Sequence, residues 1–114
     1  MRYEEAKKIN TQIIECCKKI FNTKRDLVTK QLEDEFPEFI VYFHLYLDEK
    51  DKNQMCDVKA SHKSLPIKFT FTLIRQVNDD IFRGKTGIET IVINEKIQIE
   101  EEAETIHQTI LKNI

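Results

Sequence analysis

The chain has 114 residues, of which 40% are hydrophobic and 33% are charged, and its formal net charge at pH 7 is −2. This length fits one hydrophobic core, so we expect residues 1–114 to form a single domain. The composition argues against a disordered chain, because every segment contains apolar residues and only two Gly and two Pro are present.

The expected location follows from the apolar runs and the cysteines. No apolar run is long enough to cross a bilayer, and the first five residues carry two acids where a signal peptide needs basic residues. Three cysteines, two of them adjacent, form a poor disulfide framework. We therefore expect a cytoplasmic protein with free thiols in a reducing intracellular compartment.

Charge is unevenly distributed along the chain. Residues 1–32 carry eight Lys or Arg and only four Asp or Glu, while the remaining residues are acidic overall. A basic N-terminal third can steer an anionic partner toward the protein. The alternative is that these charges form only the solvated surface of helices.

Two helices are predicted in the first third of the chain. Apolar residues at helical spacing predict an amphipathic helix over residues 3–21, with Cys16 in the apolar stripe and Cys17 at its edge. A second, short helix is predicted to open with a capping box at Thr23 and Asp26. Pro37 disfavours a helical conformation at Phe36 and should end it there.

The middle of the chain changes to the two-residue period of strands. Residues 39–48 alternate strictly between two faces. One set of side chains is predicted to face the core: Phe39, Val41, Phe43, Leu45 and Leu47. The other set is Ile40, Tyr42, His44 and Tyr46. After a turn at 49–52, residues 53–60 and 67–73 predict two further strands.

The last third is predicted to contain turns at 78–80 and 84–87. A final hairpin is expected from residues 88–93 and 97–99, folding about Asn94, Glu95 and Lys96. Residues 100–114 have the apolar spacing of a closing helix. No strand–helix–strand crossover is present, so the fold class is α+β: two N-terminal helices, an antiparallel sheet of four or five strands, and a C-terminal helix packed on one sheet face.

The first predicted hairpin has a defined register. A four-residue loop at 49–52 places Phe43 opposite Val58, and His44 opposite Asp57 on the other face. A slip of one residue would place Phe43 opposite Lys59. The His44–Asp57 pair resembles part of a catalytic relay, but no Ser or Cys is expected beside His44 to act as the nucleophile, so a cross-strand polar pair is the simpler interpretation.

Other candidate sites have ordinary structural explanations. The segment from Arg83 to Gly87 resembles a phosphate-binding loop but lacks the required upstream glycine, since that position is Asp79. Cys16 and Cys17 lack the spacer that lets two thiolates bind one zinc ion. We therefore expect no cofactor, no metal and no catalytic residues.

The remaining candidate is a surface on the sheet face opposite the helices. It is formed by the partner-binding residues Tyr42, His44, Tyr46, Met55, Lys59 and Lys68. Aromatic and Met side chains are enriched at protein interfaces, so the sequence favours a non-enzymatic protein-binding module, such as an adaptor, inhibitor or regulatory subunit, acting through a sheet face or edge. The first alternative is a single-stranded nucleic-acid binder. The second is a small enzyme centred on His44 and Asp57. A third alternative is that other elements of the chain simply cover this face, in which case it is not a binding site. A homo-oligomer is a special case of protein binding.

Overall fold

A computed structural model describes residues 2–80 and 85–99 of the chain. Helix α1 (Tyr3–Cys17), a short 3₁₀ helix η1 (Lys18–Phe21) and helix α2 (Arg25–Glu35) precede four strands. These are β1 (Phe39–Leu47), β2 (Gln54–His62), β3 (Ile67–Asp80) and β4 (Lys85–Ile99). The predicted α+β order of two helices followed by an antiparallel sheet is confirmed. The helix predicted over residues 100–114 lies outside the described residues.

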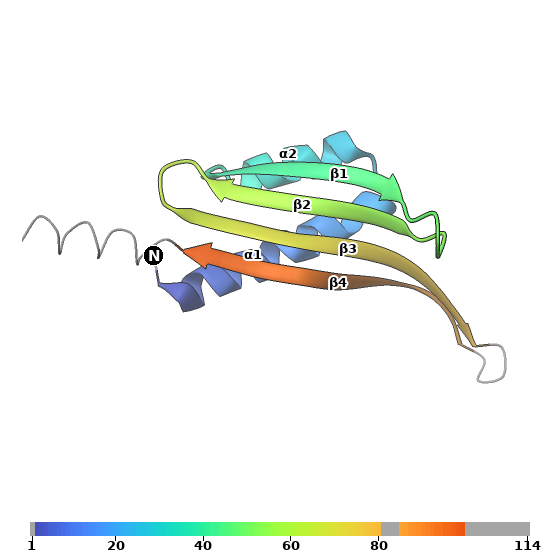
Figure 1. Cartoon of the computed structure of the whole chain (residues 1–114). Coiled ribbons are helices and arrows are strands. Elements are labelled where there is room, and N and C mark those ends of the chain that lie inside the picture. The colour runs from blue at the N-terminus through green and yellow to red at the C-terminus, as the bar shows by residue number, and fades with distance from the viewer. Residues whose placement is uncertain (1, 81–84, 100–114) are drawn as a thin grey trace, which may run out of the picture.

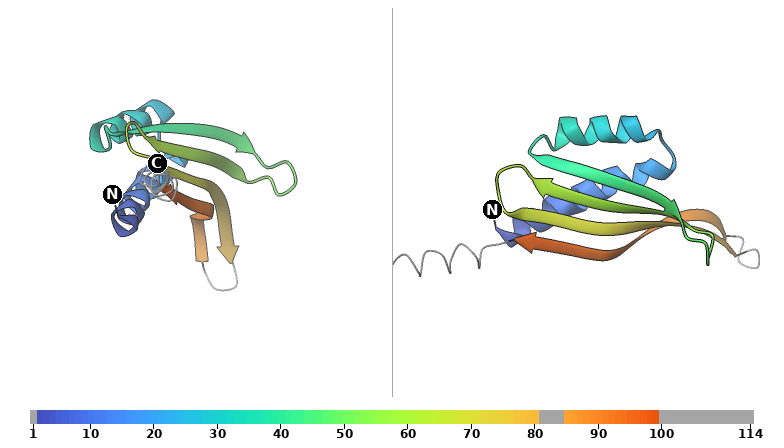
Figure 2. Two further views of the ribbon diagram at one scale, coloured as in Figure 1. Left: turned by 60° about the vertical axis from the view of Figure 1, so that its left-hand side comes forward. Right: turned by 45° about the horizontal axis from the view of Figure 1, so that its top comes forward.

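The four strands form one antiparallel sheet in the order β1-β2-β3-β4 (Figure 1). Both helices lie on the same face of this sheet, α2 beside β1 and α1 behind the other strands, in contact with β4 (Figures 1 and 2). The opposite face carries no helix among the described residues, and we call it the open face. β1 and β4 are the two edge strands.

The core lies between the helices and the inward side of the sheet. Alternate strand residues meet the apolar stripe of α1 and side chains of α2, as the two-residue and 3.6-residue periods require. The buried strand side chains are Phe39, Phe43, Cys56, Val58, Ala60, Ile67, Phe69, Phe71 and Leu73. Burying a Val, Leu or Phe side chain contributes roughly 1.5–3 kcal/mol.

The side chains of β1 that were predicted to face the core do point toward the helices, but they are not buried along the whole strand. Phe39 and Phe43 are buried, whereas Leu45 and Leu47 are 42% and 54% exposed. The buried part of the strand is the part that lies beside α2, which is 11 residues long. Strand alternation determines which way a side chain points, but only the packed helix determines whether it is covered.

The register predicted for the first hairpin is confirmed. Phe43 lies opposite Val58, and His44 lies opposite Asp57. The loop is closed by a hydrogen bond from the Asp48 N–H to the Asn53 carbonyl, 2.9 Å long. Lys52 adopts a φ of 58°, which allows the chain to reverse within this loop.

The capping box predicted for the second helix is wrong. α2 begins at Arg25, its N-cap is Lys24, and no side chain caps it. The carbonyl of Lys24 accepts hydrogen bonds from the N–H groups of Leu27 and Val28. The predicted end is confirmed, because α2 stops at Glu35, and Phe36 before Pro37 has a non-helical φ of −128°.

The turns predicted at 78–80 and 94–96 are wrong, and the sheet has four strands. β3 continues to Asp80, and β4 runs without interruption from Lys85. The register between β3 and β4 shifts between Thr70 and Thr72, where β4 holds one extra residue. Asn94 has a φ of 54°, so its turn-forming conformation makes a β-bulge rather than a hairpin.

The turn predicted at 84–87 is replaced by the start of β4. Lys85, Thr86 and Gly87 pair with Asp80, Asp79 and Asn78, while residues 83 and 84 lie outside the described part. This antiparallel pairing is unlike the strand-to-helix context of a phosphate-binding loop. Within residues 2–80 and 85–99, no helix has the length and apolar character needed to span a membrane.

Candidate functional site on the open sheet face

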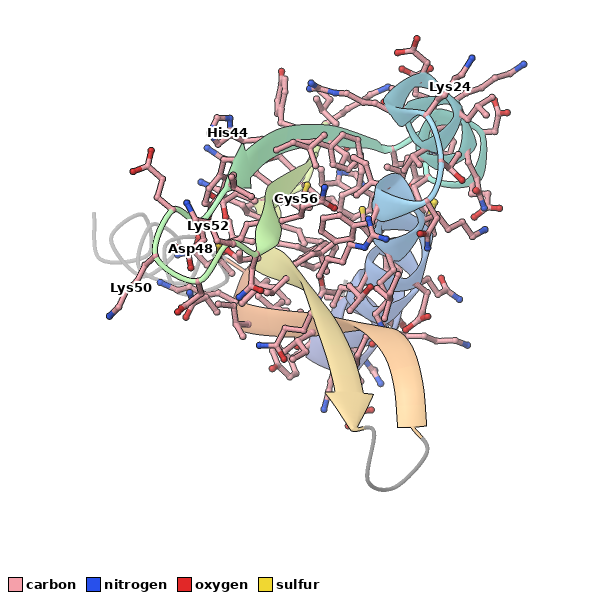
Figure 3. All side chains as sticks on the ribbon, turned by 90° about the vertical axis from the view of Figure 1, so that its right-hand side faces the viewer. Lys24, His44, Asp48, Lys50, Lys52 and Cys56 are labelled. Atoms are coloured by element: carbon pink, nitrogen blue, oxygen red, sulfur yellow. The ribbon has the colours of Figure 1, made fainter. Side chains whose placement is uncertain are left out.

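The six residues predicted for partner binding lie on the open face. Register pairs Tyr42 with Lys59 and Tyr46 with Met55, and the side chains alternate away from the buried Phe43 and Val58. Tyr42 is 65% exposed and Tyr46 is 37% exposed. His44 and Lys59 are exposed, and Met55 and Lys68 are partly exposed. In Figure 3, His44 points away from the helices whereas Cys56 points toward them.

The Asp57 carboxylate is held by neighbours other than His44. The Tyr46 hydroxyl donates a hydrogen bond to Asp57 Oδ1 at 3.1 Å, and Thr72 Oγ1 donates to the same oxygen at 2.8 Å. The His44 ring stacks on the Tyr46 ring, with centroids 5.4 Å apart. The predicted opposition of His44 and Asp57 is therefore correct, but the polar contacts of Asp57 run to Tyr46 and Thr72.

This hydrogen bond also affects the ionisation of Tyr46. Partial burial, followed by the hydrogen bond to the Asp57 carboxylate, raises the pKa of the Tyr46 hydroxyl above its ordinary value. The hydroxyl therefore stays protonated and remains a donor at neutral pH. Tyr46 is held in place by Asp57 and by His44, so its ring forms an ordered part of the surface.

An apolar row crosses the open face from one edge strand to the other. Successive registers join four side chains, one from each strand: Tyr46, Met55, Ile74 and Ile91. The last three are partly exposed. Sequence reasoning missed Ile74 because the third strand was predicted to end at Leu73, and it missed the position of Ile91 because β4 was divided into two strands. The alternation past Leu73 was the available signal.

A basic row lies four residues farther along β1, β2 and β3. Register joins Tyr42, Lys59, Thr70 and Lys96 across the four strands. Lys68 lies in the next row, between Ser61 and Gln98. The open face thus has an apolar region toward the β1–β2 loop and a basic region toward the β2–β3 connection, with His44, Asp57, Thr72 and Ile93 between them.

A shallow hollow of about 390 Å³ lies at the centre of the open face. It is lined by side chains and backbone of Tyr42, Phe43, His44, Asp57, Val58, Lys59, Thr70, Phe71, Thr72 and Asn94. The bulge at Asn94 brings that residue to the hollow's rim. The hollow combines an aromatic wall with one carboxylate and one ammonium, a mixture typical of a binding surface.

The thiols lie on the other side of the sheet, away from this hollow. Cys16, Cys17 and Cys56 are all free and buried, and Cys17 is fully buried rather than at the edge of the stripe as predicted. Burial raises the pKa of each of the three thiols, that of Cys56 to about 11. In the part of the chain that the structure describes, no three His, Cys, Asp or Glu side chains are grouped to hold a metal ion.

Comparisons with protein-family models, with curated proteins and with solved structures found no match to this chain.

Proposed function

We propose that the protein is a non-enzymatic binding module that engages another protein through its open face. The observation that supports this best is the apolar row of Tyr46, Met55, Ile74 and Ile91, on a sheet face that no helix covers among the described residues. Tyr42, on the same face, is 65% exposed. Contiguous exposed apolar groups rimmed by polar residues mark interaction sites in soluble proteins.

The chemistry of this face suits a protein partner. Aromatic and Met side chains are enriched in interface centres, and a polar rim supplies orientation through hydrogen bonds. Tyr46 is already held by Asp57 and stacked on His44, so little conformational entropy is lost when a partner covers it. The three free thiols support placing this interaction in a reducing intracellular compartment.

The first prediction concerns Tyr42 and Tyr46. Replacing both with Ser is expected to leave the fold intact and to weaken partner binding by about fivefold or more, because truncating an aromatic anchor commonly costs more than about 1 kcal/mol. The partner is first identified by affinity capture with mass spectrometry. Its affinity is then measured by calorimetry for the wild type, Tyr42→Ser/Tyr46→Ser, and the matched control Tyr3→Ser.

Tyr3 is a suitable control because it is 57% exposed but belongs to α1, on the other side of the sheet. Thermal melting of each variant shows whether the fold is retained. If the double variant folds and binds as tightly as the wild type, the open face is not the site and α1 becomes the next candidate.

A second candidate function, binding of single-stranded nucleic acid, is favoured by the basic row. Tyr42 lies directly opposite Lys59, with Lys96 in the same row, and unpaired bases stack on such aromatic side chains beside cations. Affinity for a short oligothymidine, followed by fluorescence anisotropy, would then fall steeply between about 50 and 200 mM salt. A mainly apolar protein contact would change little over that range.

A further inference from the structure

Among residues 2–80 and 85–99, nothing pairs with the outer edge of β1 as a strand. Backbone hydrogen bonds at the two ends of the hairpin join Asp48 to Asn53 and Glu38 to Lys63, so the even-numbered residues of β1 bond to β2. In an antiparallel ladder the odd-numbered residues must then direct their N–H and C=O groups outward. A hydrogen bond of 3.1 Å from Arg25 Nη2 to the carbonyl of Phe43 agrees with this direction.

The two edge strands differ in how they are protected from pairing. β4 contains Lys85, Glu89, Glu95 and Lys96 as well as the bulge, and charges and bulges are the usual protection of a sheet edge. β1 has the sequence FIVYFHLYL, with no Asp, Glu, Lys or Arg. An uncharged edge of nine residues is a template for another strand.

A groove and two exposed leucines lie on this same edge. The groove, of about 360 Å³, lies between α2 and the first half of β1 and is lined by Thr29, Leu32, Glu33, Pro37, Phe39, Ile40, Val41, Phe43 and Lys63. Leu45 and Leu47 follow in the second half of β1, 42% and 54% exposed on the same face. The first half of β1 therefore borders a groove that is not filled. The second half carries two leucines that are not covered by the described residues.

We propose that β1 pairs with β1 of a second copy of this chain, antiparallel about a twofold axis at His44. In this register, Val41 lies opposite the partner's Leu47, and Phe43 lies opposite the partner's Leu45. The partner's two leucines then enter the groove beside α2, and the same contact is repeated by symmetry. Each copy thus covers the exposed leucines of the other, as an isologous interface requires.

Charges at the ends of the strand favour this register over its neighbours. It places Glu38 opposite the partner's Lys50, and the partner's Glu49 beside Phe39, where Lys63 lines the groove. A shift of the axis to Phe43 would oppose Glu38 to the partner's Asp48. A shift to Leu45 would bring the partner's Glu49 to Val41, on the groove that Glu33 also lines. Both shifts place like charges together.

Arg25 occupies the position that the partner's backbone would take. In the paired state the N–H of the partner's Leu45 donates to the carbonyl of Phe43, and the guanidinium of Arg25 moves toward solvent. Outward N–H and C=O groups of Val41, Phe43, Leu45 and Leu47 become paired. In the described part of one chain, this edge is therefore capped at the carbonyl of Phe43 and otherwise open.

The oligomeric state of the full chain, measured by light scattering after size exclusion, tests the proposal. The wild type is expected at twice the 13.6 kDa mass of one chain. Leu47→Glu places a carboxylate opposite Val41 of the other copy, on the groove that Glu33 also lines, and should weaken the dimer about tenfold or more. Ile88→Glu is the matched control, since Ile88 is also 54% exposed but lies on β4, and should remain dimeric.

Disulfide formation tests the register itself. His44 lies on the twofold axis in a non-hydrogen-bonded pair, so His44→Cys would place two thiols within bonding range across the axis. A disulfide-linked dimer should form under mild oxidation, and the native cysteines add little background because all three are buried. Tyr42→Cys, on the same face of the same strand, lies opposite the partner's Tyr46 and should form no such bond.

A wild type of single-chain mass at high micromolar concentration overturns the proposal. So does a dimer that Leu47→Glu leaves unchanged, or a Tyr42→Cys variant that cross-links as readily as His44→Cys. The inference does not rest on the proposed function, because it uses the edge and the helix-bearing face. Loss of partner binding in Ile74→Ser/Ile91→Ser, which changes β3 and β4 and not the β1 edge, with the dimer intact would separate the two.

Discussion

Asn10 is a polar side chain with no exposed surface, placed in the apolar stripe of α1. Its amide nitrogen donates a hydrogen bond of 2.6 Å to Glu95 Oε1, next to the bulge in β4. Its amide oxygen is buried with no hydrogen-bond partner among the described residues. The hydrogen bond to Glu95 therefore pairs only the nitrogen of this buried amide, and it joins α1 to the edge strand.

The hydrogen bond between Asn10 and Glu95 leads to a prediction about stability. Glu95→Leu leaves the Asn10 amide buried with no acceptor and should lower the free energy of unfolding by about 1–3 kcal/mol. Asn10→Leu combined with Glu95→Leu removes both polar partners and should be closer to the wild type than Glu95→Leu alone. Urea denaturation of the single and double variants measures the difference. Additive losses in the double variant would show that the two side chains are not coupled.

Cys56 gives the protein a defined response to alkaline pH. Its thiol is fully buried behind the sheet, and burial raises the pKa from 9.0 to about 11. The unfolded chain therefore releases this proton at lower pH than the folded protein, and rising pH favours unfolding. The contribution of the buried, protonated Cys56 thiol to the free energy of unfolding is fully present below pH 9 and is lost as the pH rises toward 11. Cys17 acts in the same direction, because burial also raises its pKa.

This response can be measured by chemical denaturation at pH 8, 9.5 and 10.5. We expect the free energy of unfolding of the wild type to fall across the series, and that of Cys56→Ala to fall less steeply from a lower starting value. Native thiol titration should also find these cysteines unreactive until the protein unfolds. Equal slopes for both proteins would remove Cys56 as the cause.

At the scale of elements, the bulge in β4 is the feature that the sequence pattern did not distinguish from a turn. Asn94 tolerates a positive φ better than most residues, and the same preference serves a turn or a bulge. The sequence of Asn94, Glu95 and Lys96 interrupts the apolar alternation in the same way whether these residues form a turn or a bulge. The pairing of β4 with β3 on both sides of Asn94 decides between them.

Substitution at Asn94 tests the strained position. Asn94→Ile places a β-branched residue at a φ of 54° and should destabilise the protein by about 1–2 kcal/mol. Asn94→Gly accepts this conformation and should remain within about 1 kcal/mol of the wild type. Thermal and urea unfolding of both variants give the comparison. An isoleucine variant as stable as the glycine variant would contradict the assigned bulge geometry.

At the scale of the whole molecule, one face and one edge of the sheet are left open among the described residues. Both helices lie on one face, and the exposed apolar row lies on the other. Pairing at β1 would extend the sheet without covering the open face. Two copies of the open face would then lie side by side, so the proposed dimer and the proposed partner site are compatible.

Local sequence patterns predicted two helices, the β1–β2 hairpin with its register, and six residues of the open face. Each of these depends on periodicity or on a short loop, which are properties of neighbouring residues. The length of β3, the bulge at Asn94 and the contribution of Ile74 and Ile91 depend on pairing between distant strands. Which inward side chains are covered, as Phe43 is and Leu47 is not, was decided only by where the helices pack. Alternation determines the direction of a side chain, whereas burial requires a second layer that no local pattern specifies.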